Sequence, residues 1–205
     1  MLKESFLGRN PSHFLRVDPI VKAYIVSESF LWSAWNFTTP IFAIFATHDI
    51  KGGTIEIAAS AYSVYLVSRV IFELIGGRMT AKYTDRKKIY VTIFGIAAIS
   101  LAYVGFSTAS FPLELFLYYA MVGAGLGLIS PAKNSMFAIH LDKNKEATEW
   151  SIADATSFIA MALATALGGF IAGVYGFRVL FLLAALVNLL AIPSYLVFIW
   201  KKNQA

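Results

Sequence analysis

Five side chains that can hold a ligand follow one another near the start of the chain: Glu28, Trp32, Trp35, Asn36 and Thr39. They lie in an apolar stretch at steps of four, three, one and three residues. This spacing places them along one stripe of a helix. A carboxylate, two indoles, an amide and a hydroxyl can bind a polar molecule through charge and hydrogen bonds. The alternative is structural, with Glu28 capping or pairing locally and the Trp side chains packing.

Four more charges interrupt apolar stretches later in the chain. Arg69 and Glu73 are four residues apart on one helix face, so they can form an ion pair. Lys133 and Asp154 lie in two further stretches, and we expect all four toward the same end of their helices. Charges inside a membrane segment are candidates for function. We therefore treat the four as a candidate gating network, with a structural ion pair or extension to the membrane surface as the competing explanation for Arg69 and Glu73.

Enzymatic and metal chemistry find little support in the sequence. It contains no Cys, and His13, His48 and His140 are too far apart for metal-ligand spacing. The signatures of serine hydrolases, zinc peptidases and P-loop nucleotide-binding proteins are missing. The segments between the apolar stretches are too short for a soluble catalytic domain. We expect no enzyme activity and no cofactor.

Composition then indicates where such a chain must reside. It is 58% hydrophobic, and its mean hydropathy of +0.67 is too high for an ordinary soluble domain. About 20 apolar residues cross a bilayer as a helix. We predict an all-α integral membrane protein with six transmembrane helices, between an N-terminal segment at 1–22 and a tail at 201–205. The predicted spans are 23–46, 55–77, 89–106, 113–141, 152–175 and 179–200.

The basic residues predict the orientation of these spans. If the spans alternate in direction, thirteen Lys and Arg residues lie on one side, and only Lys51 and Arg178 lie on the other. The positive-inside rule then places both termini in the cytoplasm of a multi-pass protein, surrounded by lipid in the cell (inner) membrane. Because the basic residues stand at the ends of apolar stretches, the net charge of +5 indicates membrane topology and no nucleic-acid partner.

The connector after the second span resembles a signature loop of the major facilitator superfamily. In "GGRMTAKYTDRKK", Gly77 takes the position of the first glycine and Met79 that of the apolar residue, while Lys82, Arg86 and Lys87 take the basic positions. "GAGLGLISPAKNSMF" (123–137) is similar to the family's fourth helix. "ALGGFIAGVYGFRVLFLLAALV" (166–187) is similar to its junction of the fifth and sixth helices.

This resemblance implies a fold and a function. The family's transporters have two six-helix halves, each built from two inverted three-helix repeats, and hold substrate between the halves. The chain would be one half, and we expect the N-terminal one, transporting a small solute by alternating access. The stripe from Glu28 to Thr39 would then face substrate. The partner would be a second six-helix half; the alternatives are a six-span exporter acting as a homodimer and a truncated protein that does not transport.

Overall fold

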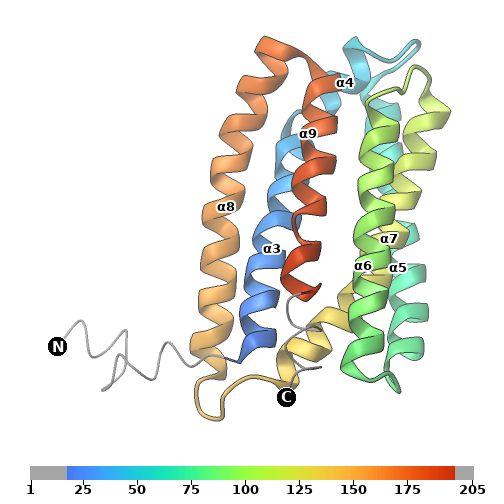
Figure 1. Ribbon diagram of the computed structural model, residues 1–205. Helices are drawn as coiled ribbons and strands as arrows, with labels where there is room; N and C mark the ends of the chain where they lie inside the picture. Colours follow the sequence, from blue (N-terminus) through green and yellow to red (C-terminus); the bar gives the residue numbers. More distant parts are fainter. Residues whose placement is uncertain (1–17, 197–205) are drawn as a thin grey trace.

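The computed structural model describes residues 18–196, and only helices and short turns occur among them. The elements, in chain order, are α3 (Pro19–Thr38), the short 3₁₀ helix η1 (Thr39–Ile41), α4 (Phe42–His48), α5 (Ile55–Thr80), α6 (Asp85–Phe106), α7 (Pro112–Ile139), α8 (Glu146–Tyr175) and α9 (Phe177–Leu189). Figure 1 shows the long helices side by side in one bundle. The all-α prediction is confirmed for this part of the chain.

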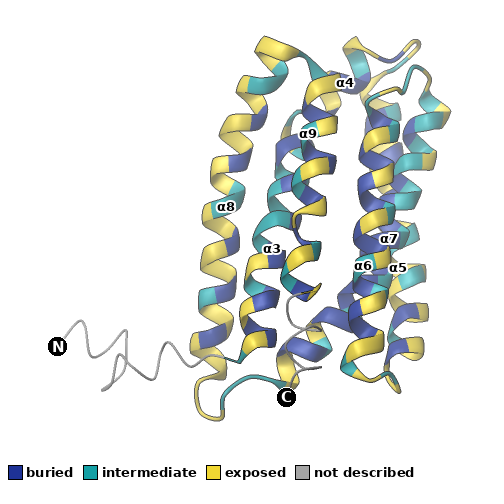
Figure 2. Ribbon diagram, viewed as in Figure 1, coloured by how far each residue is buried: buried dark blue, intermediate teal, exposed yellow. Residues whose placement is uncertain are grey.

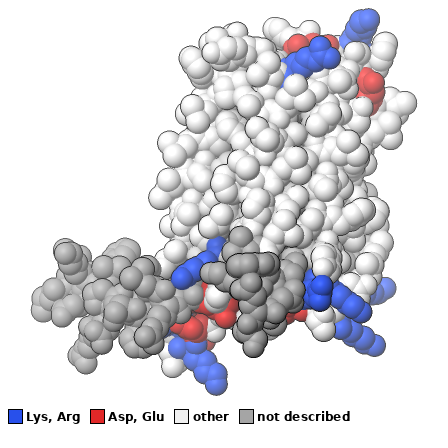
Figure 3. All heavy atoms as spheres, in the orientation of Figure 1, with Lys and Arg blue, Asp and Glu red and all other residues white. Residues whose placement is uncertain are grey.

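Five of these helices are long and apolar enough to cross a membrane: α5, α6, α7, α8 and a segment from Phe177 to Leu196 that continues α9. On the face seen in Figure 3, the Lys, Arg, Asp and Glu side chains of the described residues gather near the two ends of the bundle, and the broad surface between them is uncharged. Such a belt is suited to the hydrocarbon core of a bilayer. The chain is therefore a multi-pass membrane protein.

The first predicted span, 23–46, is not one continuous helix. It begins earlier, at Pro19, and its backbone is interrupted by η1 before continuing as α4. The cause is Pro40, which lacks an N–H and clashes with the carbonyl four residues earlier in an α-helix. The hydroxyls of Thr38 and Thr39 both donate to the carbonyl of Trp35, at 3.2 and 2.8 Å. α3 has 20 residues, but it is too polar to be among the five, and six crossings stay a prediction.

Other helix limits also differ from the predicted spans. α6 begins at Asp85 rather than 89, so Arg86 and Lys87 lie in its first turn and not in the connector. α8 begins at Glu146, six residues before the predicted 152. At the other end of α8, Gly176 alone reverses the chain into α9, with a φ of 82° that glycine adopts without strain.

Several predicted segments fall outside the described residues. They are most of the N-terminal segment at 1–22, the end of the last span near Trp200 and the tail at 201–205. In the described part, α9 stops at Leu189, and after a two-residue turn the chain is helical again up to Leu196. Pro193 lies just after this turn, and it has no backbone N–H that could donate a hydrogen bond to the preceding turn of helix.

The bundle divides into two groups of three helices. α7 packs against α5 and α6, while α3 packs against α8 and α9, and α6 joins α9 between the groups. Figure 1 shows α3, α8 and α9 together on one side. The amide of Asn188 links the groups by donating to the carbonyl of Ile96 at 2.9 Å and to the Ser100 hydroxyl at 2.8 Å. We call the end at which α3 begins and α5 ends the basic end, because Lys22, Arg78 and Lys82 lie there.

Glycines set how closely these helices approach. A Cβ added to Gly123 or Gly127 would lie 2.3 and 2.6 Å from carbonyl oxygens of α5. On the opposite side of α7, a Cβ on Gly125 would lie 3.1 Å from the carbonyl of Gly95 in α6. A Cβ on Gly168 of α8 would lie 2.3 Å from the Phe37 carbonyl of α3. In lipid, such close backbone packing replaces the hydrophobic attraction between helices.

Burial is uneven across the bundle. About half of the apolar window in α6 and in α7 is buried, but only 17% of the window in α5 and in α8. Figure 2 shows the resulting exposed stripe along α8. The exposed side chains are large and apolar, such as Val67 and Leu74 on α5 and Phe158 and Leu163 on α8. These faces are covered by lipid or by another protein.

Candidate functional site

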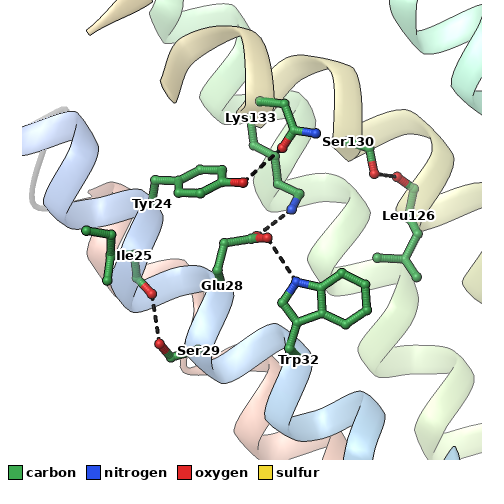
Figure 4. A network of polar contacts seen from close by, with 9 residues as sticks. Tyr24, Ile25, Glu28, Ser29, Trp32, Leu126, Ser130 and Lys133 are labelled. Carbon is green, nitrogen blue, oxygen red and sulfur yellow. Dashed lines mark hydrogen bonds and ion pairs between the residues drawn. The ribbon is translucent and has the colours of Figure 1, made fainter. Parts of the chain in front are cut away.

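A buried ion pair joins the first helix to the fourth long helix. The Lys133 ammonium on α7 contacts the Glu28 carboxylate on α3, and the two residues are 4% and 5% exposed. They are 105 positions apart in sequence. Figure 4 shows the two side chains pointing toward each other across the gap between their helices. Removing two charges from water is costly, so this pair needs close geometry and further hydrogen bonds.

Neighbouring side chains supply those hydrogen bonds. The Trp32 indole, one turn after Glu28, donates to the second carboxylate oxygen at 3.0 Å. The Lys133 ammonium lies 5.4 Å from the centre of the Tyr24 ring, close enough for a cation–π attraction. The Tyr24 hydroxyl donates to the amide oxygen of Asn134 at 3.1 Å. The charge of each partner is thus balanced within the bundle (Figure 4).

Local sequence explains where these side chains lie. Tyr24, Glu28 and Trp32 follow at intervals of four on α3, so they lie above one another on one face. On α7, Pro131 removes the backbone donor that would reach the carbonyl of Gly127, and Lys133 follows two residues later. At a rise of about 1.5 Å per residue, Glu28 lies about 14 Å from the first residue of α3, at the basic end.

The rest of the predicted stripe makes different contacts. The Trp35 ring lies 4.8 Å from that of Tyr65 on α5 and so extends away from the ion pair. Asn36 donates to the Trp32 carbonyl at 2.9 Å, and the Thr39 hydroxyl bonds to its own helix. The structure therefore brings Glu28 and Trp32 to α7, Trp35 to α5, and leaves Asn36 half-exposed.

The four gating candidates are distributed over two separate contacts. Arg69 and Glu73 pair at 3.5 Å on α5, and Arg69 also donates to the Tyr65 hydroxyl at 2.8 Å. Arg69 lies near the middle of α5, deeper than expected. Lys133 pairs with Glu28, a stripe residue, rather than with Arg69 or Glu73. Asp154 lies on α8 beside Glu28, where both line one cleft. A gating role for the four stays a prediction.

The residues of the signature loop lie at the basic end. Gly77 has open space around it, and Met79 and Lys82 are exposed. Arg86 donates to the Tyr90 hydroxyl at 3.3 Å, and the Lys87 ammonium lies 5.8 Å from the ring centre of Tyr83. These contacts lie within the α5–α6 turn and the first two turns of α6, so in the described residues they stabilise the turn itself.

Two links from α6 to α7 at the same end were not predicted. The Lys88 ammonium donates to the Ser135 hydroxyl at 2.9 Å. His140, which follows α7, lies 3.6 Å from the carboxylate of Asp85 at the start of α6. A signal existed for the first: Lys88 ends a run of basic residues, and a Lys that faces the bundle needs an acceptor. No local pattern connects His140 to Asp85.

A cleft of about 250 Å³ lies between α3 and α8, next to the ion pair. We call it the α3–α8 cleft. Carboxylates, aromatic rings and a thioether line it together, from Tyr24, Glu28, Trp32, Asp154, Phe158 and Met161. Sequence spacing did not reveal it, because its two walls are more than a hundred residues apart. No group of acidic or His side chains that could hold a metal occurs in residues 18–196.

Comparisons with known proteins agree with this architecture. A sequence model of the Major Facilitator Superfamily matches residues 25–204. Among solved structures, the crystal structure of PepTSo, a transporter of the POT family, is similar in fold with a TM-score of 0.73 and 14% sequence identity. The match covers 87% of this chain and 37% of that one, so the chain spans well under half the length of PepTSo. No curated protein sequence matches significantly.

Proposed function

This chain belongs to the major facilitator superfamily, and from that premise we propose that it transports a small solute across the cell membrane by alternating access. Family and fold point to a transporter rather than an enzyme. The proposed substrate path runs along α3, on the stripe from Glu28 to Asn36. In this proposal the basic end of the bundle, where the described chain begins and ends, faces the cytoplasm. This orientation agrees with the excess of Lys and Arg at the basic end.

The buried pair of Glu28 and Lys133 is the observation that carries this proposal. Charged side chains in a membrane segment are rare, because each one costs free energy unless it is paired or hydrated. A structural link between α3 and α7 could be made by apolar side chains at lower cost. We infer that this pair is retained because it opens when α3 and α7 change their positions during transport, exposing one or both charges to the solute path.

We further propose that the chain acts together with a second set of six helices. The exposed apolar faces of α5 and α8 flank α3 and α7, and would be covered by such a partner. α3 packs against α8 and α9, and α7 packs in the same way against α5 and α6. Two three-helix repeats that begin with α3 and α7 would produce this arrangement.

The mass of the complex extracted in mild detergent tests the partner. We expect a particle larger than one 22.5 kDa chain, containing a second and different multi-pass protein. A particle made of two copies of this chain alone would instead support the homodimeric exporter. A single chain under all mild conditions would contradict both forms of the partner proposal.

Alternating access can be tested without knowing the solute. Because the chain contains no Cys, one introduced Cys gives a clean signal. We expect Asn36→Cys, on the half-exposed part of the stripe, to react with a membrane-impermeant thiol reagent added from either side of native membranes. The reason is that a solute path must be open to water from each side in turn.

A matched variant controls for leakage of the reagent. Ile159 on α8 is 65% exposed on an apolar surface, so Ile159→Cys should stay unreactive from both sides. Reaction of Asn36→Cys from one side only, or from neither, would rule out alternating access along α3. Native membranes are used so that any partner remains in place.

A further inference from the structure

The α3–α8 cleft has an unbalanced negative charge. Of its two carboxylates, Glu28 is neutralised by Lys133. Asp154 forms no ion pair with any residue in 18–196, and no Lys, Arg or His occurs among the described residues that line the cleft. Asp154 lies about 12 Å along α8 from its first residue, at a depth similar to that of Glu28 on α3. Asp154 is exposed on α8, so its unpaired carboxylate is accessible to a cationic occupant of the cleft.

Aromatic rings form much of the cleft wall. Trp32, Tyr24 and Phe158 are the side chains whose π faces attract cations, Trp most strongly. The structure already contains one such contact, because the Lys133 ammonium lies 5.4 Å from the Tyr24 ring centre. Phe158 lines the cleft from α8, where its ring can contact a ligand. Met161 adds a polarisable thioether that adapts to apolar groups of different shapes.

We propose that the α3–α8 cleft binds compact organic cations, such as quaternary or protonated amines carrying an apolar group. Asp154 supplies the opposite charge, Trp32 and Phe158 cover the cationic centre, and Met161 contacts the apolar group. The volume of about 250 Å³ limits the ligand to a small molecule. This inference rests on the proposed function, since it assigns a substrate class to the path along α3.

Two probes of similar size and opposite charge test the ligand class. The purified chain, with any partner that copurifies, is titrated with phenyltrimethylammonium and with benzenesulfonate, and binding is followed by calorimetry. We expect the cation to bind and the anion not to bind. Asp154→Asn should weaken binding of the cation by at least about tenfold, because the counter-charge is lost while the shape is kept. Glu146→Gln, an exposed acid two turns earlier on α8, should bind the cation like the wild type.

Each other outcome has a definite meaning. Equal or tighter binding of benzenesulfonate, no binding of either probe, or an unchanged affinity in Asp154→Asn would overturn the cationic class. If Asn36→Cys still reacts from both sides in that case, the transport proposal stands and only the substrate class falls. Repeating the titration with added phosphatidylcholine distinguishes a free amine from a lipid headgroup, because only a headgroup site would be blocked by the lipid.

Discussion

Replacing Lys133 by Met should destabilise the protein by about 3 kcal/mol, because it leaves the buried Glu28 carboxylate without its partner. The measurement is thermal unfolding in detergent, followed by circular dichroism. The Trp32 indole alone cannot balance a full negative charge. Glu28 must then stay charged at a cost or take up a proton, and either change weakens the link between α3 and α7.

The double variant E28Q/K133M separates charge from packing. Both side chains are then neutral and of nearly native volume, and Trp32 can still donate to the carbonyl oxygen of the amide introduced in place of the Glu28 carboxylate. We expect it to recover most of the lost stability, since replacing a whole buried ion pair is often close to neutral. If the double variant were as unstable as Lys133→Met, the loss would come from packing and not from the unpaired charge.

A surface Lys provides the matched control for this experiment. Lys145 also pairs with a carboxylate, that of Asp142 at 2.8 Å, and the hydrogen bond raises the pKa of its ammonium. This pair is exposed to solvent, where ion pairs contribute little to stability. Lys145→Met should therefore leave the melting temperature unchanged. An equal decrease in both Lys variants would show that burial of the Glu28–Lys133 pair is not what matters.

Replacing Gly123 by Ala should have an effect of similar size, for a steric reason. The added methyl group would lie 2.3 Å from the Tyr65 carbonyl oxygen and 2.9 Å from the Ser68 Cβ. Both atoms belong to α5, and the nearest is backbone, which cannot turn aside as a flexible side chain does. α5 and α7 must therefore separate along their whole contact, and we expect a loss of about 3 kcal/mol in the free energy of unfolding.

The same substitution elsewhere in the chain should have no such cost. A Cβ added to Gly173 on α8 meets nothing within 4 Å. Gly173→Ala should leave the stability unchanged or raise it slightly, because Ala favours the helix. Comparing the two variants by thermal unfolding isolates the helix contact from the change in propensity. Gly123→Ala with native stability would mean that α5 and α7 are not held this close.

Much of the architecture could be predicted from local pattern. Apolar stretches of sufficient length indicate membrane helices wherever they occur, because each backbone group must find its hydrogen bond inside its own helix. The Gly-rich stretch 123–128 predicts close helix contacts, because residues without a side chain let two helix backbones approach each other. Pro40 was visible too, but its consequence for the first span was missed, since apolar length alone does not show a break in the hydrogen-bond ladder.

The partners of the polar residues could not be predicted in this way. Spacing placed Glu28 and Trp32 on one stripe, but it equally grouped Trp35 with them, which contacts α5 instead. The expected position near one end of the helices likewise grouped Lys133 with Arg69 and Glu73, although Lys133 pairs with Glu28. Helical periodicity is a property of about four neighbouring residues. The rotation of one helix against another depends on the packing of the whole bundle.

The sequence by itself therefore determined that this is an all-helical membrane protein. It also determined which stripe of the first helix is polar and which helix faces carry residues small enough for close contact. Those properties follow from hydrogen bonding and side-chain size along a single helix. Only the tertiary structure decided that Glu28 contacts Lys133, and that Asp154 lines the same cleft as Glu28. Contacts across more than a hundred residues arise when the helices dock, and docking is set by all their faces together.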